Sequence, residues 1–150
     1  MNAVVAFLHH LAAFTLVASL AVEFVLIRDE LTPRNARRLQ LADLVFGISA
    51  GAILVLGALR VAYFEKGAAY YLHSAPFIAK ITLFALVGLL SVYPTKQFLR
   101  WGRAQKQGAL PVVAAAVTQR IRTVIHLELA LVALLILCAA LMAKGIGQFA

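Results

Sequence analysis

Four long apolar runs dominate this sequence and constrain its fold more than any other feature. They cover residues 3–27, 39–64, 75–93 and 121–143. A helix needs about 20 apolar residues to cross the hydrocarbon core of a bilayer. Of the 150 residues, 63% are hydrophobic and only 13% are charged, which is more apolar surface than a soluble domain of this size can bury. The sequence therefore predicts an integral membrane protein.

The predicted fold is all-α, a transmembrane four-helix bundle that forms a single domain over residues 1–150. With their flanks, the helices are expected at about residues 3–28, 38–64, 75–98 and 113–143. The first run has no Lys or Arg before Arg28 and so lacks the basic region of a signal peptide. Thr32-Pro33-Arg34-Asn35 is interpreted as a short turn, because proline keeps the preceding residue out of a helix.

The distribution of charge predicts the topology. The formal net charge is +8, and most Lys and Arg residues lie in or beside the loops after the first and third runs, whereas Arg60, Lys66 and Lys144 lie on the other side. The positive-inside rule then places both basic loops in the cytoplasm and both termini outside. The basic residues form no stripe interleaved with aromatic residues, so we expect the lipid bilayer as the partner and no nucleic acid.

Gly47 and Gly51 form a GxxxG pair in the second run, and Gly57 continues this surface of small residues. Such a surface lets helices approach closely. Packing inside the bundle is the favoured interpretation. A dedicated face for a homo-oligomer is the alternative.

Ionisable residues inside the apolar runs are the best candidates for function, because charges in a bilayer are costly and usually face the bundle interior. At about 1.5 Å per helical residue they fall into two layers. The outer layer, which is basic, contains His9, His10, Arg60 and Lys80, and the inner layer, which is mostly acidic, contains Glu23, Asp43, His126 and Glu128.

His9 and His10 cannot both face the bundle axis, because successive residues of a helix point about 100° apart. The face of His9 carries Ala13 and Glu23, which favours His9 as the inward residue. Its imidazole could be a hydrogen-bonding strut or an axial ligand of haem. His126 lies about 12 Å deeper, so a bis-histidine haem is not favoured.

The inner layer also allows two interpretations. The carboxylates could pair with cytoplasmic arginines and hold the helices together, or they could relay protons. On the first interpretation we expect Glu128 to pair with Arg122 or Arg120. No HxxxH or ExxH spacing is present, so a non-haem metal site is not favoured.

The helices also carry a family resemblance, in the segments LHHLAAF, NARRLQLADLVFGISAGAILVLGAL, PFIAKITLFALVGLLS and QRIRTVIHLELALVALLI. The chain resembles the HemJ-type membrane protoporphyrinogen oxidases, the CopD-like copper-resistance membrane proteins, and a family of short bacterial inner-membrane proteins without an assigned function. The resemblance covers nearly the whole chain and implies the bacterial inner membrane as its location.

The HemJ-type resemblance implies haem b, with functional residues at His9 (or the adjacent His10) and Lys80, and an acidic residue at Glu128. The chain departs from that family in having two adjacent histidines and Leu127-Glu128 in place of an Asn-Glu pair. The leading hypothesis is therefore a redox-active haem b protein, which either acts as an oxidoreductase on a porphyrin or quinone-like molecule or transfers electrons. In it, His9 or His10 binds iron as the metal ligand, and Lys80 and Arg60 pair with anionic groups. Lys80 is also its candidate catalytic residue.

Two other functions compete with this hypothesis. One is a CopD-like protein that handles or transports metal without haem. Its weakness is that Met1 and Met142 are the only methionines, whereas a Cu(I) pathway favours thioether ligands. The other is a purely structural subunit.

Overall fold

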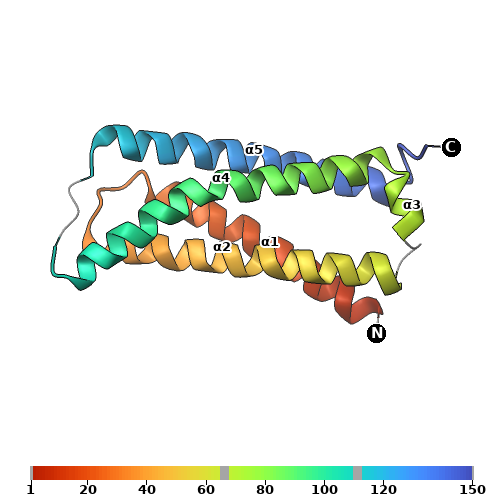
Figure 1. The fold of residues 1–150 in the computed structure, drawn as a ribbon, viewed down its shortest axis with the longest axis horizontal. Coiled ribbons are helices and arrows are strands. Elements are labelled where there is room, and N and C mark those ends of the chain that lie inside the picture. The colour runs from red at the N-terminus through yellow and green to blue at the C-terminus, as the bar shows by residue number, and fades with distance from the viewer. Residues whose placement is uncertain (1, 65–67, 110–112, 150) are drawn as a thin grey trace.

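Four long helices build the structure and run side by side as one elongated bundle (Figure 1). The computed structural model describes residues 2–64, 68–109 and 113–149. The long helices are α1 (Asn2–Leu26), α2 (Pro33–Leu59), α4 (Ala75–Lys106) and α5 (Ala115–Ala143). Between α2 and α4 lie the π-helix η1 (Arg60–Phe64) and the short helix α3 (Ala68–Leu72). The predicted all-α bundle is confirmed, whereas η1 and α3 were not predicted.

The surface of the bundle is that of a protein in lipid. Each of the four long helices is long and apolar enough to cross a membrane. Large apolar side chains point away from the bundle, among them Phe14 (73% exposed), Ile48 (65%) and Leu89 (71%). Contact between so many apolar side chains and water would be costly, so the bundle belongs in a bilayer.

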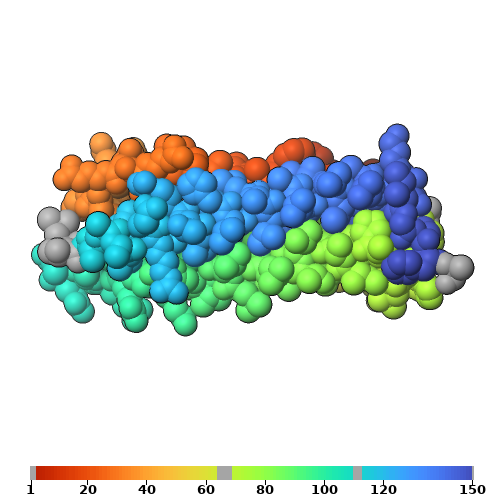
Figure 2. Space-filling view, turned by 90° about the horizontal axis from the view of Figure 1, so that it is seen from above, coloured from red at the N-terminus to blue at the C-terminus, as the bar shows by residue number. Residues whose placement is uncertain are grey.

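The helices pack in two antiparallel pairs. The most extensive contacts join α1 to α2 and α4 to α5, and contacts of α2 with α4 and of α1 with α5 close the bundle. Figure 2 shows α5 running along one face, with α1 on one side and α4 on the other. The core is a continuous apolar cluster that includes Leu20, Leu39, Phe98, Ile121 and Ile125.

The start of α2 follows from local capping. Thr32 is extended (φ −85°, ψ 161°), and its hydroxyl accepts a hydrogen bond from the Asn35 N–H at 3.2 Å. Pro33 occupies the first turn, where a missing N–H costs nothing. The stretch interpreted as a turn is therefore a helix start, and α2 begins at Pro33 instead of near residue 38.

Helix α4 extends beyond its expected end near residue 98 and reaches Lys106, although it contains Pro94. Its last turns are held by α2: the Gln40 amide donates to the Phe98 carbonyl, and Gly102 leaves the space in which the Gln40 side chain lies. These long-range contacts explain why an apolar run that ends at Tyr93 continues as a helix.

Both chain termini lie at the same end of the bundle, here called the terminal end (Figure 1). There the Phe149 N–H donates to the His73 carbonyl at 2.8 Å, and the Ala75 N–H donates to the Gly147 carbonyl at 2.9 Å. The other end, here called the basic end, carries the loop between α1 and α2. Lys66, which was assigned to the terminal side from sequence, lies outside the described residues.

The GxxxG pair does not pack inside the bundle, so the favoured interpretation of this motif is wrong. Gly47 and Gly51 are exposed, and a Cβ atom at either position would meet nothing within 4 Å. Gly57 differs, because a Cβ atom there would lie 3.3 Å from the His9 ring. Only this glycine, among the three, is needed for a close contact.

Candidate functional site

The two adjacent histidines of α1 point in different directions. His9 is 9% exposed, whereas His10 is exposed and its Nδ1 lies 2.6 Å from the Ala6 carbonyl of the preceding turn. Their ring planes stand at 87° to one another. The prediction that His9 is the inward residue is confirmed.

The His9 ring is held against α2. The main chain of Ile53 is a hydrogen-bond partner of the ring, and Gly57, one turn further on, leaves space for it. His9 Nδ1 is buried and has no hydrogen-bond partner. Because Nδ1 is unpartnered, the bond to Ile53 falls to Nε2, whose N–H can donate to a carbonyl. Nδ1 then carries a free lone pair.

Two cationic side chains interact electrostatically with the His9 ring. The electrostatic interactions of its ring are with Lys80 of α4, Arg60 of η1 and the neighbouring His10. Lys80 in turn interacts with Arg60 and with Cys138 of α5. We call His9, Arg60 and Lys80 the outer cluster. The structure thus brings together three of the four residues of the predicted outer layer, and His10 is turned away from the interior.

The outer cluster includes an irregular piece of helix. Arg60 is the first residue of η1, the π-helix that continues α2. Short π-helical segments inside α-helices are rare and occur frequently at functional sites. This irregularity, like the contact between Gly57 and His9, had no distinct signal in the sequence.

Three carboxyl groups from three helices form a second group nearer the basic end. Glu23 of α1 interacts electrostatically with Asp43 of α2 and with Glu128 of α5. The Thr95 hydroxyl of α4 donates to Asp43 Oδ1 at 2.6 Å. We call Glu23, Asp43 and Glu128 the carboxylate cluster. Thr95 was not among the predicted residues, because a threonine within an apolar helix can equally bond to its own backbone.

The other members of the predicted inner layer lie elsewhere. His126 is exposed: its Nδ1 lies 2.7 Å from the Arg122 carbonyl, and its ring packs edge-on against Phe24 with centroids 4.6 Å apart. Both carboxylate oxygens of Glu128 lack a hydrogen-bond partner, so the predicted pairing with Arg122 or Arg120 is wrong.

The reason for this error lies in the contacts of the arginines. The Arg120 guanidinium lies over the Tyr93 ring, 4.9 Å from its centroid, and the Arg122 Nε is buried without a hydrogen-bond partner. On a helix, Arg122 and Glu128 are six residues apart and point to different faces.

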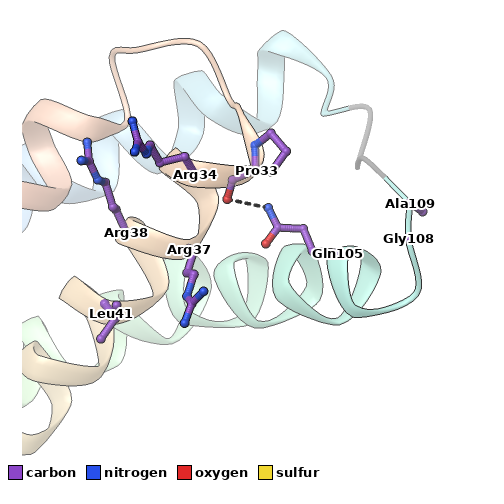
Figure 3. A pocket seen from close by; sticks show the side chains of 8 residues that line it. All are labelled: Pro33, Arg34, Arg37, Arg38, Leu41, Gln105, Gly108 and Ala109. Carbon is purple, nitrogen blue, oxygen red and sulfur yellow. Dashed lines mark hydrogen bonds between the residues drawn. The ribbon is translucent and has the colours of Figure 1, made fainter.

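Two cavities open at the basic end. The larger, of about 630 Å³, is lined by Arg34, Arg37 and Arg38, and across it the Gln105 amide donates to the Pro33 carbonyl at 2.9 Å (Figure 3). The smaller, of about 270 Å³, is lined by residues that include Ile27, Leu39 and Trp101. Neither is lined by the outer cluster. In the part of the chain that the structure describes, no group of three or more His, Cys, Asp or Glu side chains could hold a metal ion.

Comparison with known proteins gives one family. The chain belongs to the family described as "Predicted membrane protein (DUF2214)", whose model matches residues 1–147. No curated protein and no solved structure matches the chain. The family supports a membrane protein and assigns neither haem nor redox chemistry, so the likeness to HemJ-type and CopD-like proteins rests on the sequence segments alone.

Proposed function

We propose that this member of the DUF2214 family binds haem b in the outer cluster and takes part in a redox reaction. The observation that carries the proposal is the buried, unpartnered Nδ1 of His9. Histidines that bind metals commonly donate their other ring N–H to a backbone carbonyl, which fixes the ring and its tautomer. The contact with Ile53 supplies such a support. One histidine is a sufficient protein ligand for haem iron.

The charges of the outer cluster favour an anionic ligand over a free metal ion. Lys80 and Arg60 act on His9 electrostatically, and two cations beside the imidazole would repel a metal cation. The same cations would bind the carboxylate groups of haem propionates through charge-assisted hydrogen bonds. The residues therefore fit haem b better than the metal-handling alternative.

The chemistry proposed is the oxidation of a reduced porphyrin or quinol-like substrate. Haem b, when bound, supplies one-electron redox chemistry. In this proposal His9 holds the iron, Lys80 and Arg60 orient anionic groups, and the surrounding apolar helices exclude water. In this proposal Lys80 also interacts with an anionic group of the substrate and is the candidate catalytic residue.

Titration of the detergent-purified protein with haem b tests this proposal. We expect saturation at one haem per chain. Lys80→Met should weaken binding by about 10–100-fold, because a hydrogen bond to a charged group contributes about 1.5–3 kcal/mol. Lys96→Met is the matched control, since Lys96 is exposed on the same helix. Absorbance that rises without saturation, or equal effects of the two substitutions, would contradict the proposal.

We also propose that the protein lies in the bacterial inner membrane and that both of its termini are on the outer side, away from the cytoplasm. The loops rich in Lys and Arg lie at the basic end, opposite the termini. A phosphatase that is active only outside the cytoplasm should be active when fused after the last residue. A reporter that fluoresces only in the cytoplasm should stay dark there, and its fluorescence would reverse the topology.

A further inference from the structure

The carboxylate cluster is not used by the proposed haem site. It joins α1, α2 and α5 through Glu23, Asp43 and Glu128, and Thr95 of α4 completes it by donating to Asp43. All four long helices thus direct a polar group to one region of the interior. This arrangement requires a physical explanation of its own.

The two glutamates are almost completely buried, and no hydrogen bond compensates the loss of water at most of their carboxyl oxygens. Glu23 is 2% exposed and Glu128 is 1% exposed. One oxygen of Glu23 and both oxygens of Glu128 have no hydrogen-bond partner. An ionised carboxylate in such surroundings would cost several kcal/mol, and three neighbouring negative charges would cost more. The glutamates are therefore best accommodated as neutral carboxylic acids, each holding a proton.

The basic side chains that the structure describes near this region do not neutralise the carboxylate cluster. The Arg28 guanidinium lies over the Phe24 ring at 4.1 Å, and Arg120 lies over the Tyr93 ring. Arg122 makes no hydrogen bond to Glu128, and His126 faces outward against Phe24. Aromatic rings, rather than the carboxyl groups, hold the two arginines Arg28 and Arg120.

Asp43 differs from the two glutamates. Its side chain is only half-buried, and the Thr95 hydroxyl donates to one of its oxygens. A donated hydrogen bond stabilises the negative charge of a carboxylate. Asp43 is therefore the member of the cluster whose negative charge has the most stabilisation from its surroundings.

A cavity at the basic end approaches this region. The cavity of about 270 Å³ opens at the basic end beside Asp29 and Glu30 and is lined by Ile27 and Leu39. Ile27 is one helical turn from Glu23, and Leu39 is one turn from Asp43. Polar residues stand at its entrance, and the carboxyl groups lie about one turn, or about 5.4 Å, beyond its apolar wall.

We propose that Glu23, Asp43 and Glu128 form a proton-exchange site inside the bundle, supplied from this cavity. The carboxyl groups make no direct hydrogen bond to one another, so each step needs water from the cavity: a carboxylic acid gives its proton to a water molecule, a carboxylate of the cluster takes a proton from water, and the negative charge moves in the opposite direction. No electron is transferred, and the site takes no metal. This inference is independent of the proposed haem site.

Infrared spectroscopy of the folded protein in bilayers tests the proposal. At neutral pH we expect a C=O stretching band of protonated carboxylic acids that shifts when H₂O is replaced by D₂O. Glu23→Gln and Glu128→Gln should each remove part of this band, because glutamine keeps the shape of the protonated acid. Glu65→Gln, which removes an acid that belongs neither to the carboxylate cluster nor to the cavity lining named above, is the control and should leave the band intact.

Circular dichroism verifies that each variant is helical, and Glu23→Gln replaces Glu128→Gln if the latter does not fold. Absence of the band in the wild-type protein would show ionised carboxylates and overturn the proposal. A band that fails to shift in D₂O would show buried acids without exchange, which would also overturn it.

Discussion

Replacement of His9 with alanine is expected to abolish haem binding, whereas His10→Ala should leave haem content close to that of the wild-type protein. The two residues are chemically identical neighbours, so the pair is a matched comparison. His9 is buried with Nδ1 unpartnered, while His10 is exposed and its Nδ1 lies within hydrogen-bonding distance of its own helix. Loss of the sole iron ligand should reduce bound haem by about tenfold or more. Bound haem per chain is measured as the pyridine haemochrome.

A second variant separates loss of the ligand from loss of the fold. His9→Gly leaves space beside Gly57, and added imidazole should restore the haem spectrum if the missing group is the iron ligand. Loss of haem in both His9→Ala and His10→Ala, without rescue of His9→Gly, would point to a structural role. Wild-type haem content in both alanine variants would remove His9 from the site.

Gly57→Leu is expected to have the next largest effect. Even a single Cβ atom at Gly57 would lie 3.3 Å from His9 Cε1, so a leucine must displace the ring. Displacement would also break the contact between His9 and Ile53. Loss of such support for a ligating histidine typically weakens binding by about 10–100-fold. Haem titration of the purified variant measures this effect.

Gly51→Leu is the control for this substitution. Gly51 lies on the same helix, and a Cβ atom there meets nothing within 4 Å. A leucine at this position should face lipid and leave both helicity and haem affinity unchanged. Equal loss in both variants would mean that α2 tolerates no bulky residue, and unchanged affinity in both would show that the His9 position does not matter for haem.

Much of the fold could be predicted from the sequence, because a helix that crosses a bilayer needs an apolar run of about 20 residues, and runs of this length are easy to recognise. The inward direction of His9 could also be predicted, since Glu23 lies on its face and a carboxyl group avoids lipid. Both predictions depend on the free-energy cost of placing polar groups in lipid, which can be judged from the sequence of one helix. Features that depend on contacts with a neighbouring helix could not be predicted in this way.

The missed features depend on how the helices pack against one another and against lipid. In a membrane protein the side chains facing lipid and those facing the interior are both apolar, so periodicity does not identify the buried face. The exposed position of Gly47 and Gly51 could not be predicted for this reason. The extension of α4 to Lys106 depends on Gln40, which is distant in sequence.

The most direct test of the proposed function is the visible spectrum of the wild-type protein after purification from membranes, recorded oxidised and reduced. We expect a Soret band that shifts on reduction, with one haem b per chain. A colourless protein from cells that make haem, or haem far below one per chain that does not rise on titration, would contradict it.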